Sequence, residues 1–297
     1  MPETALIARC FLAVLAVLHF SCLLAAPADA RGFGGGNGGG MRGGAAPPPE
    51  LPEGVDPAIA AAFMPLFANR QAMAASGFVD TGLVPVYPAD ADCPHMGSPF
   101  AATTRSDVSI RSRRFYQGLH GGMDIPAPGG TALLAIADGT VVHLANGGGN
   151  IGGLSLILRH APEDTGLGVW TYSEYKHIRE LPDLAIGERV QRGQRIAETG
   201  NTGTTGGHFG DEGLDHLHLT AFWSKSSEFQ IGRMLIPEAG QWMDPLAFFR
   251  RDGIVDSAAL HELPGEAKRI SVSYATAGGR TVPEDAKVIW PYACTLH

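Results

Sequence analysis

Residues 215–222 read Asp-His-Leu-His-Leu-Thr-Ala-Phe, a short run in which polar and apolar side chains alternate at its start. In a β-strand, successive side chains point to opposite faces. His216 and His218 would then share one face, while Leu217 and Leu219 would face a core. The stretch therefore predicts a half-buried strand that presents two imidazoles together.

Similar short runs lie on the N-terminal side of this strand and are separated by glycine-containing turns. Apolar and β-branched residues dominate each run, which favours strands. The runs are residues 131–136, 139–144, 154–159 and 170–177. Regular short strands with turn signals indicate a mainly β domain. Asp244-Pro245 begins a short predicted helix that closes this domain, because aspartate and proline are favoured at a helix start.

His120 and Asp124 lie four residues apart in the sequence Leu119-His-Gly-Gly-Met-Asp-Ile-Pro126. The two glycines and the proline argue against a helix and favour a loop that enters a strand. A catalytic zinc keeps three protein ligands and one open position, and imidazole nitrogen and carboxylate oxygen are common ligands. His120, Asp124 and one histidine of the 215–222 strand supply such a set. Spacing alone leaves open whether the third ligand is His216 or His218.

These motifs together resemble the lysostaphin-type (LytM-like) zinc endopeptidases of the M23 family, which cleave bacterial cell-wall peptides. The resemblance covers roughly residues 120–249. It rests on five pieces: His120-Gly-Gly-Met-Asp124 with its continuation to Val141, the segment 152–160, Tyr175-Lys-His177-Ile, the segment 190–203, and His216-Leu-His218-Leu.

The resemblance implies an antiparallel β-sheet or sandwich with short flanking helices, and one Zn²⁺ per chain. It makes His120, Asp124 and His218 the metal ligands, and His177 and His216 the catalytic histidines. The implied activity is hydrolysis of peptidoglycan peptides by a zinc-activated water. Two alternatives stay open. One is a non-cutting protein of the same fold that binds peptidoglycan or regulates a hydrolase, and the other is a peptidase that acts on proteins.

The sequence departs from the family pattern around the last strand. Extra residues stand between Gly207 and His216, and residues 224–243 look inserted. His208, in the first insertion, is a candidate for an additional ligand. Tyr175 fits either a core position or the wall of a substrate groove. These departures affect the expected substrate preference more than the expected chemistry.

The first thirty residues predict a secretory signal peptide. Arg9 precedes an apolar run over residues 11–26, and Ala28-Asp29-Ala30 is a small-x-small cleavage site. The run falls short of the ~20 residues that a membrane span needs, so no stable membrane insertion is expected after cleavage. An uncleaved N-terminal anchor is the alternative interpretation of the same residues. Export to the periplasm or the extracellular space follows from this interpretation.

Composition suggests further boundaries along the chain. Residues 31–54 form a linker rich in glycine and proline. We expect an N-terminal flanking segment over residues 55–112, the peptidase domain over 113–250 and a C-terminal extension over 251–297. Asp56-Pro57 predicts the start of a helix that packs on the main domain, or of an inhibitory segment that covers the active site. In the extension, the sequence predicts one strand, residues 269–274.

The charge and the cysteine content of the chain indicate which partners and which compartment to expect. The 297 residues carry a formal net charge of −8 and no run of lysine or arginine, which argues against nucleic-acid binding. Cys93 and Cys294 remain after signal cleavage, and they could pair in an oxidising compartment or stay as two thiols. Nothing in the sequence indicates an oligomeric state.

Overall fold

A computed structural model describes residues 50–147, 152–204, 213–232 and 234–297. The predicted signal peptide (1–30), most of the linker (31–54) and His208 lie outside the described residues. The backbone divides into two compact units, Met1–Pro47 and Pro48–His297, and all described residues belong to the second. Within the described part of the chain, no helix is long and apolar enough to cross a membrane.

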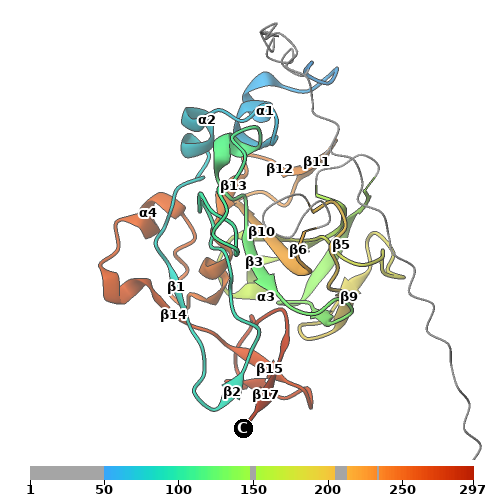
Figure 1. Cartoon of the computed structure of the whole chain (residues 1–297), viewed down its shortest axis with the longest axis vertical. Helices are drawn as coiled ribbons and strands as arrows, with labels where there is room; N and C mark the ends of the chain where they lie inside the picture. The colour runs from blue at the N-terminus through green and yellow to red at the C-terminus, as the bar shows by residue number, and fades with distance from the viewer. Residues whose placement is uncertain (1–49, 148–151, 205–212, 233) are drawn as a thin grey trace, which may run out of the picture. The chain divides into compact units, whose positions relative to one another are not determined.

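A seven-stranded antiparallel sheet forms the centre of the second unit (Figure 1). Strand β10 (His216–Ser224) pairs with β7 (Trp170–Lys176) on one side. On its other side, β10 pairs first with β3 (Met123–Pro126) and then with β13 (Gln241–Met243). Beyond β7 the sheet continues through β6 (Leu154–His160), β5 (Gly139–Asn146) and β8 (Arg189–Val190). The predicted mainly β, antiparallel fold is therefore confirmed.

Alternation along the strands builds two hydrophobic clusters on opposite faces of this sheet. Leu217, Leu219 and Tyr175 belong to one cluster, whereas Phe222 and Tyr172 belong to the other. Because His216 and His218 are separated from Phe222 by an even number of residues, both histidines point to the face of the second cluster. The predicted sharing of one face by the two histidines is thus observed.

Two short helices cover the apolar end of that face. Helix α1 (Pro57–Phe63) is capped by Asp56 and ends before Pro65, and α2 (Arg70–Ala75) is capped by Asn69. The Phe63 ring lies 5.8 Å from the ring of Trp242, whose indole N–H donates to the carbonyl of Ala62. The predicted capped helix therefore packs on the main sheet.

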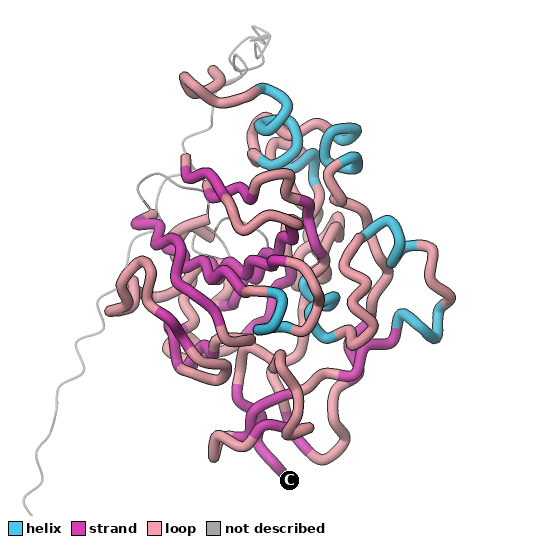
Figure 2. Tube along the Cα trace, turned by 180° about the vertical axis from the view of Figure 1, so that it is seen from behind, coloured by secondary structure: helices cyan, strands magenta, loops and turns pink. Residues whose placement is uncertain are grey.

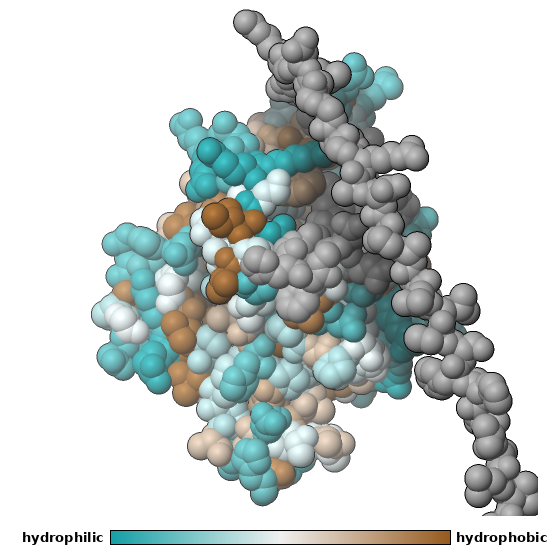
Figure 3. Space-filling model, viewed as in Figure 1, coloured by the Kyte–Doolittle hydropathy of each residue, from teal (hydrophilic) through white to brown (hydrophobic). Residues whose placement is uncertain are grey.

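Smaller sheets and short helices surround the central sheet, and Figure 2 shows how short the helical segments are. Two-stranded sheets join β4 (Ala132–Leu134) to β9 (Arg195–Glu198), and β11 (Phe229–Ile231) to β12 (Leu235–Pro237). The short helices are α3 (Pro162–Thr165), η1 (Tyr116–Gly118) and η2 (Pro245–Phe249). As predicted, Asp244 caps η2, and the helix is of the 3₁₀ type. Figure 3 shows hydrophobic spots separated by hydrophilic surface on one face.

The C-terminal extension holds more structure than the single strand predicted over residues 269–274. It contains α4 (Ser257–His261), η3 (Gly265–Lys268), β14 (Arg269–Ser271), β15 (Tyr274–Thr276), β16 (Thr281–Val282) and β17 (Ala293–Leu296). The predicted strand is interrupted because its two halves pair with different partners. Strand β14 pairs with β1 (Val84–Val86), whereas β15 pairs with β16 and β17.

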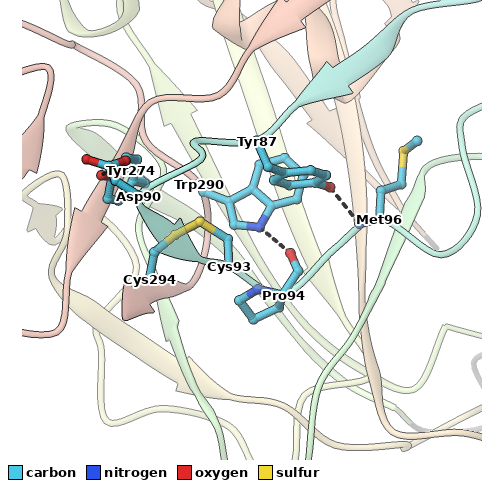
Figure 4. The surroundings of a disulfide bond; sticks show 8 residues. All are labelled: Tyr87, Asp90, Cys93, Pro94, Met96, Tyr274, Trp290 and Cys294. Atoms are coloured by element: carbon cyan, nitrogen blue, oxygen red, sulfur yellow. Dashed lines mark hydrogen bonds between the residues drawn. A yellow bond between two sulfur atoms is a disulfide. The ribbon is translucent and has the colours of Figure 1, made fainter. Parts of the chain in front are cut away.

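Cys93 and Cys294 form a disulfide that ties the N-terminal segment to the end of the chain (Figure 4). Strand β17 pairs beside it with β2 (Ala91–Asp92). The indole N–H of Trp290 donates to the carbonyl of Pro94 at 2.8 Å nearby. The first of the two alternatives for these cysteines is therefore the one observed.

Candidate metal centre

Three side chains bring one ligand atom each to a common point. His120 Nε2 lies 2.9 Å from Asp124 Oδ1 and 3.0 Å from His218 Nδ1. His218 Nδ1 in turn lies 2.9 Å from the same Asp124 oxygen. This arrangement brings together the three residues that the sequence predicts as ligands.

Strand pairing explains why residues far apart in the sequence meet here. Asp124 lies on β3 directly opposite His218 on β10, and His120 lies in the loop that enters β3. Gly122 permits the close approach of the two strands, because a Cβ atom there would stand 2.5 Å from the Leu219 carbonyl oxygen. The glycines of the His-Gly-Gly-Met-Asp motif therefore serve the packing of the site.

Hydrogen bonding fixes which nitrogen of His120 is free. Its Nδ1 lies 2.8 Å from the carbonyl oxygen of Pro99, and a carbonyl can only accept, so Nδ1 carries the proton. The lone pair of Nε2 then faces the carboxylate oxygen of Asp124, which is also an acceptor. Two electron pairs at this distance need a cation between them. The donor set of two imidazoles and one carboxylate therefore fits a metal ion.

Burial keeps three histidines of the site, His120, His177 and His218, neutral. It lowers the pKa of His120 and lowers the pKa of His218 well below its ordinary value. For His177, burial and then the repulsion that a protonated His216 would exert lower the pKa to about 3. Desolvation disfavours the charged imidazolium, and a neutral imidazole is the form that binds a metal or accepts a proton.

His177 and His216 lie beside the three-residue cluster. Their ring centroids are 4.8 Å apart, and His216 Nε2 is 3.5 Å from Asp124 Oδ1. Nδ1 of His177 donates to the carbonyl of Thr202, and Nδ1 of His216 donates to that of Leu214. In the neutral tautomers this leaves Nε2 of each ring unprotonated. The structure thus brings all five predicted site residues together.

The backbone of His177 adopts an unusual conformation, with φ at +62°. This left-handed region is sparsely populated by residues other than glycine, and such strain is concentrated at functional sites. The hydrogen bond from the His177 ring to Thr202 and the packing of the ring against His216 hold the residue there.

An open cleft of about 840 Å³ contains all five residues. Its apolar wall includes Met64 and Phe67 from the N-terminal segment, and Phe115. His143, which the sequence does not distinguish from a structural histidine, also lines the cleft. Tyr175 does not, because it is fully buried and its hydroxyl accepts from the amide of Ile136. The core alternative for Tyr175 is therefore the correct one.

One residue of the site has no signal in the sequence. Arg111 donates to Asp124 Oδ2 at 2.8 Å, from a segment in which Arg105, Arg113 and Arg114 are equally plausible candidates. Only the folding of residues 98–111 against β3 distinguishes it from them. The sequence shows several arginines before the His120 motif, but it does not show which of them contacts Asp124.

Comparison with known proteins agrees with this geometry. Residues 118–227, which include all five site residues, match the model of peptidase family M23. An uncharacterized metalloprotease of Haemophilus influenzae is 36% identical over 114 residues, which are 38% of this chain and 21% of that protein. This chain therefore matches only about a fifth of that relative's length. The resemblance to the M23 family is confirmed for the matched segment.

Solved structures with a similar segment include LytU, a zinc-containing peptidase and lysostaphin. LytU is 26% identical, with 49% of this chain and 81% of that chain covered and a TM-score of 0.33. A zinc-containing peptidase from Vibrio cholerae is 21% identical, with coverages of 50% and 37% and a TM-score of 0.32. Lysostaphin from Staphylococcus simulans is 17% identical, with 66% of each chain covered and a TM-score of 0.37.

Proposed function

We propose that this chain, with its M23 segment, is an exported zinc metalloendopeptidase that hydrolyses peptide bonds of bacterial peptidoglycan. The observation that carries the proposal is the convergence of His120 Nε2, Asp124 Oδ1 and His218 Nδ1 on one point in an open cleft. These three atoms would hold one Zn²⁺ per chain. Zinc bound there supplies Lewis acidity, which polarises a carbonyl and lowers the pKa of water towards ~7.

His216 and His177 would handle the proton of the attacking water. Both offer an unprotonated Nε2 beside the ligands, and both are fixed by Nδ1 hydrogen bonds to backbone carbonyls. His216, nearer to Asp124, would orient the water and accept its proton as general base. His177 would accept a hydrogen bond from the attacking water through its unprotonated Nε2 and so help to hold the water in place.

The cleft supports a polymeric substrate. It is open to solvent, and its polar end is lined by backbone of Gly147, Gly152 and Gly203. An open cleft beside the site residues leaves room for an extended peptide. Export is supported by the predicted signal peptide and by the Cys93–Cys294 disulfide, because such bonds persist in oxidising compartments.

The proposal is tested by digestion of purified peptidoglycan with the zinc-loaded chain, with and without a chelator. Mass spectrometry identifies released peptides and their new amino termini. We expect chelator-sensitive release by the wild type and none by the His218→Ala variant. Binding to peptidoglycan without cleavage would support the regulatory alternative instead. Cleavage of casein but not of peptidoglycan would support a peptidase for protein substrates.

A further inference from the structure

Arg111 reaches the metal centre from outside the segment that matches family M23. Its side chain is 16% exposed, and its Nη2 donates to Asp124 Oδ2 at 2.8 Å and to Ser98 Oγ at 3.0 Å. Its Nε donates to the carbonyl of Thr104 at 3.1 Å. Three hydrogen bonds to three different groups fix the guanidinium in one orientation.

The two oxygens of Asp124 therefore have separate partners. Oδ1 faces His120 Nε2 and His218 Nδ1, whereas Oδ2 faces Arg111. A carboxylate can bind a metal through one oxygen or through both. An arginine that holds Oδ2 in a charge-assisted hydrogen bond favours binding through Oδ1 alone.

We propose that Arg111 is a positioning residue that keeps Asp124 a one-oxygen ligand and so preserves the open position of the metal. This inference rests on the proposed zinc function. Hydrogen-bonded partners behind a ligand orient it and tune the metal, and their loss costs about 10- to 100-fold in affinity or activity. If Oδ2 were free, it could turn to the metal and occupy the place that water needs.

The backbone of Asp124 does not depend on Arg111. The amide of Asp124 donates to the carbonyl of Ser98 at 2.9 Å, and the amide of Gly97 donates to the carbonyl of Asp124 at 2.8 Å. The Pro99 carbonyl holds the His120 ring separately. Replacement of Arg111 by a residue without donors therefore releases Asp124 Oδ2, together with Ser98 Oγ and the Thr104 carbonyl, and leaves these backbone contacts of Asp124 in place.

The test uses Arg111→Met, which keeps most of the side-chain stem and removes every donor, in the full chain loaded with Co²⁺ in place of zinc. The visible spectrum of Co²⁺ reports coordination number, because four-coordinate sites absorb more strongly than five-coordinate sites. We expect weaker bands for Arg111→Met than for the wild type. With zinc, we expect release of peptidoglycan peptides to slow by about 10- to 100-fold through kcat, with KM little changed.

Two further variants sharpen the result. Arg113→Met removes the same charge from an exposed position nearby, so its spectrum and rate should match the wild type. Arg111→Lys keeps a charged donor and should recover part of the spectrum and rate.

An Arg111→Met variant with the wild-type spectrum and kcat would overturn the inference. If Arg111→Met does not fold, Arg111→Gln takes its place, because its shorter side chain cannot reach Oδ2, and the same outcomes apply. A wild type that takes up neither zinc nor cobalt would instead refute the proposed function. The two failures are thus distinguishable.

Discussion

Gly122→Ala is the substitution whose effect on the metal centre follows most directly from the packing. A Cβ atom at this position would lie 2.5 Å from the carbonyl oxygen of Leu219 and 2.7 Å from Nε2 of His218. Close carbon–oxygen contacts lie at about 3.3 Å, so the strands must separate by roughly 0.8 Å at this point. The first of these neighbours is backbone of the central strand β10, which cannot rotate away.

The expected cost has two parts. Overpacking of this kind destabilises a protein by about 1–3 kcal/mol, which thermal unfolding would detect. Displacement of the His218 ring should also weaken zinc binding, measured by competition with a coloured chelator. Gly265→Ala is the matched control, because a Cβ atom there meets nothing within 4 Å. A Gly122→Ala variant with wild-type stability and wild-type zinc affinity would refute the packing argument.

Three further predictions concern the disulfide, a buried acid and a catalytic histidine. Cys93→Ser removes a disulfide between residues 201 apart in the sequence. Chain entropy predicts that the free energy of unfolding falls by about 5 kcal/mol, whereas disulfides typically contribute about 2–4 kcal/mol. A urea unfolding curve that matches the wild type would contradict this prediction. Burial raises the pKa of Asp244 to about 6. Between pH about 4 and about 6 the native state therefore holds a proton that the unfolded chain releases. The free energy of unfolding falls as the pH rises through this range. Asp244→Asn keeps a capping side chain and should be more stable than the wild type at pH 8, by up to about 3 kcal/mol, with no gain at pH 4; an equal difference at both pH values would disprove the assignment. His177→Asn tolerates the positive φ and should slow peptide release by about 10²- to 10⁴-fold while zinc content stays at the wild-type level, and an unchanged rate would exclude a catalytic role.

Local patterns were sufficient to predict the central strands of the fold. The alternation at His216–Phe222 identifies a strand and its buried face, because the period of two is a property of the strand itself. Asp56 and Asp244 each cap a helix where the sequence predicts a start, since capping is also a local interaction.

Features that depend on strand partners were not predictable in the same way. The strand predicted over residues 269–274 is interrupted because β14 and β15 join different sheets, and no local pattern encodes a partner. The division of ligand and catalytic roles between His216 and His218 came from the family resemblance. The register of β10 against β3, which sets His218 opposite Asp124, is visible only in the fold. Arg111 was missed for the same reason, since its partner Asp124 is met only through the packing of the N-terminal segment.

The metal content of the purified chain tests whether His120, Asp124 and His218 bind zinc. Elemental analysis of the wild type, His216→Ala and His218→Ala would be compared after loading with zinc and removal of the excess. We expect one zinc per chain in the wild type and in His216→Ala, and its loss in His218→Ala. A wild type without bound zinc, or a His218→Ala variant that keeps a full equivalent, would contradict the assignment of His120, Asp124 and His218 as the ligands.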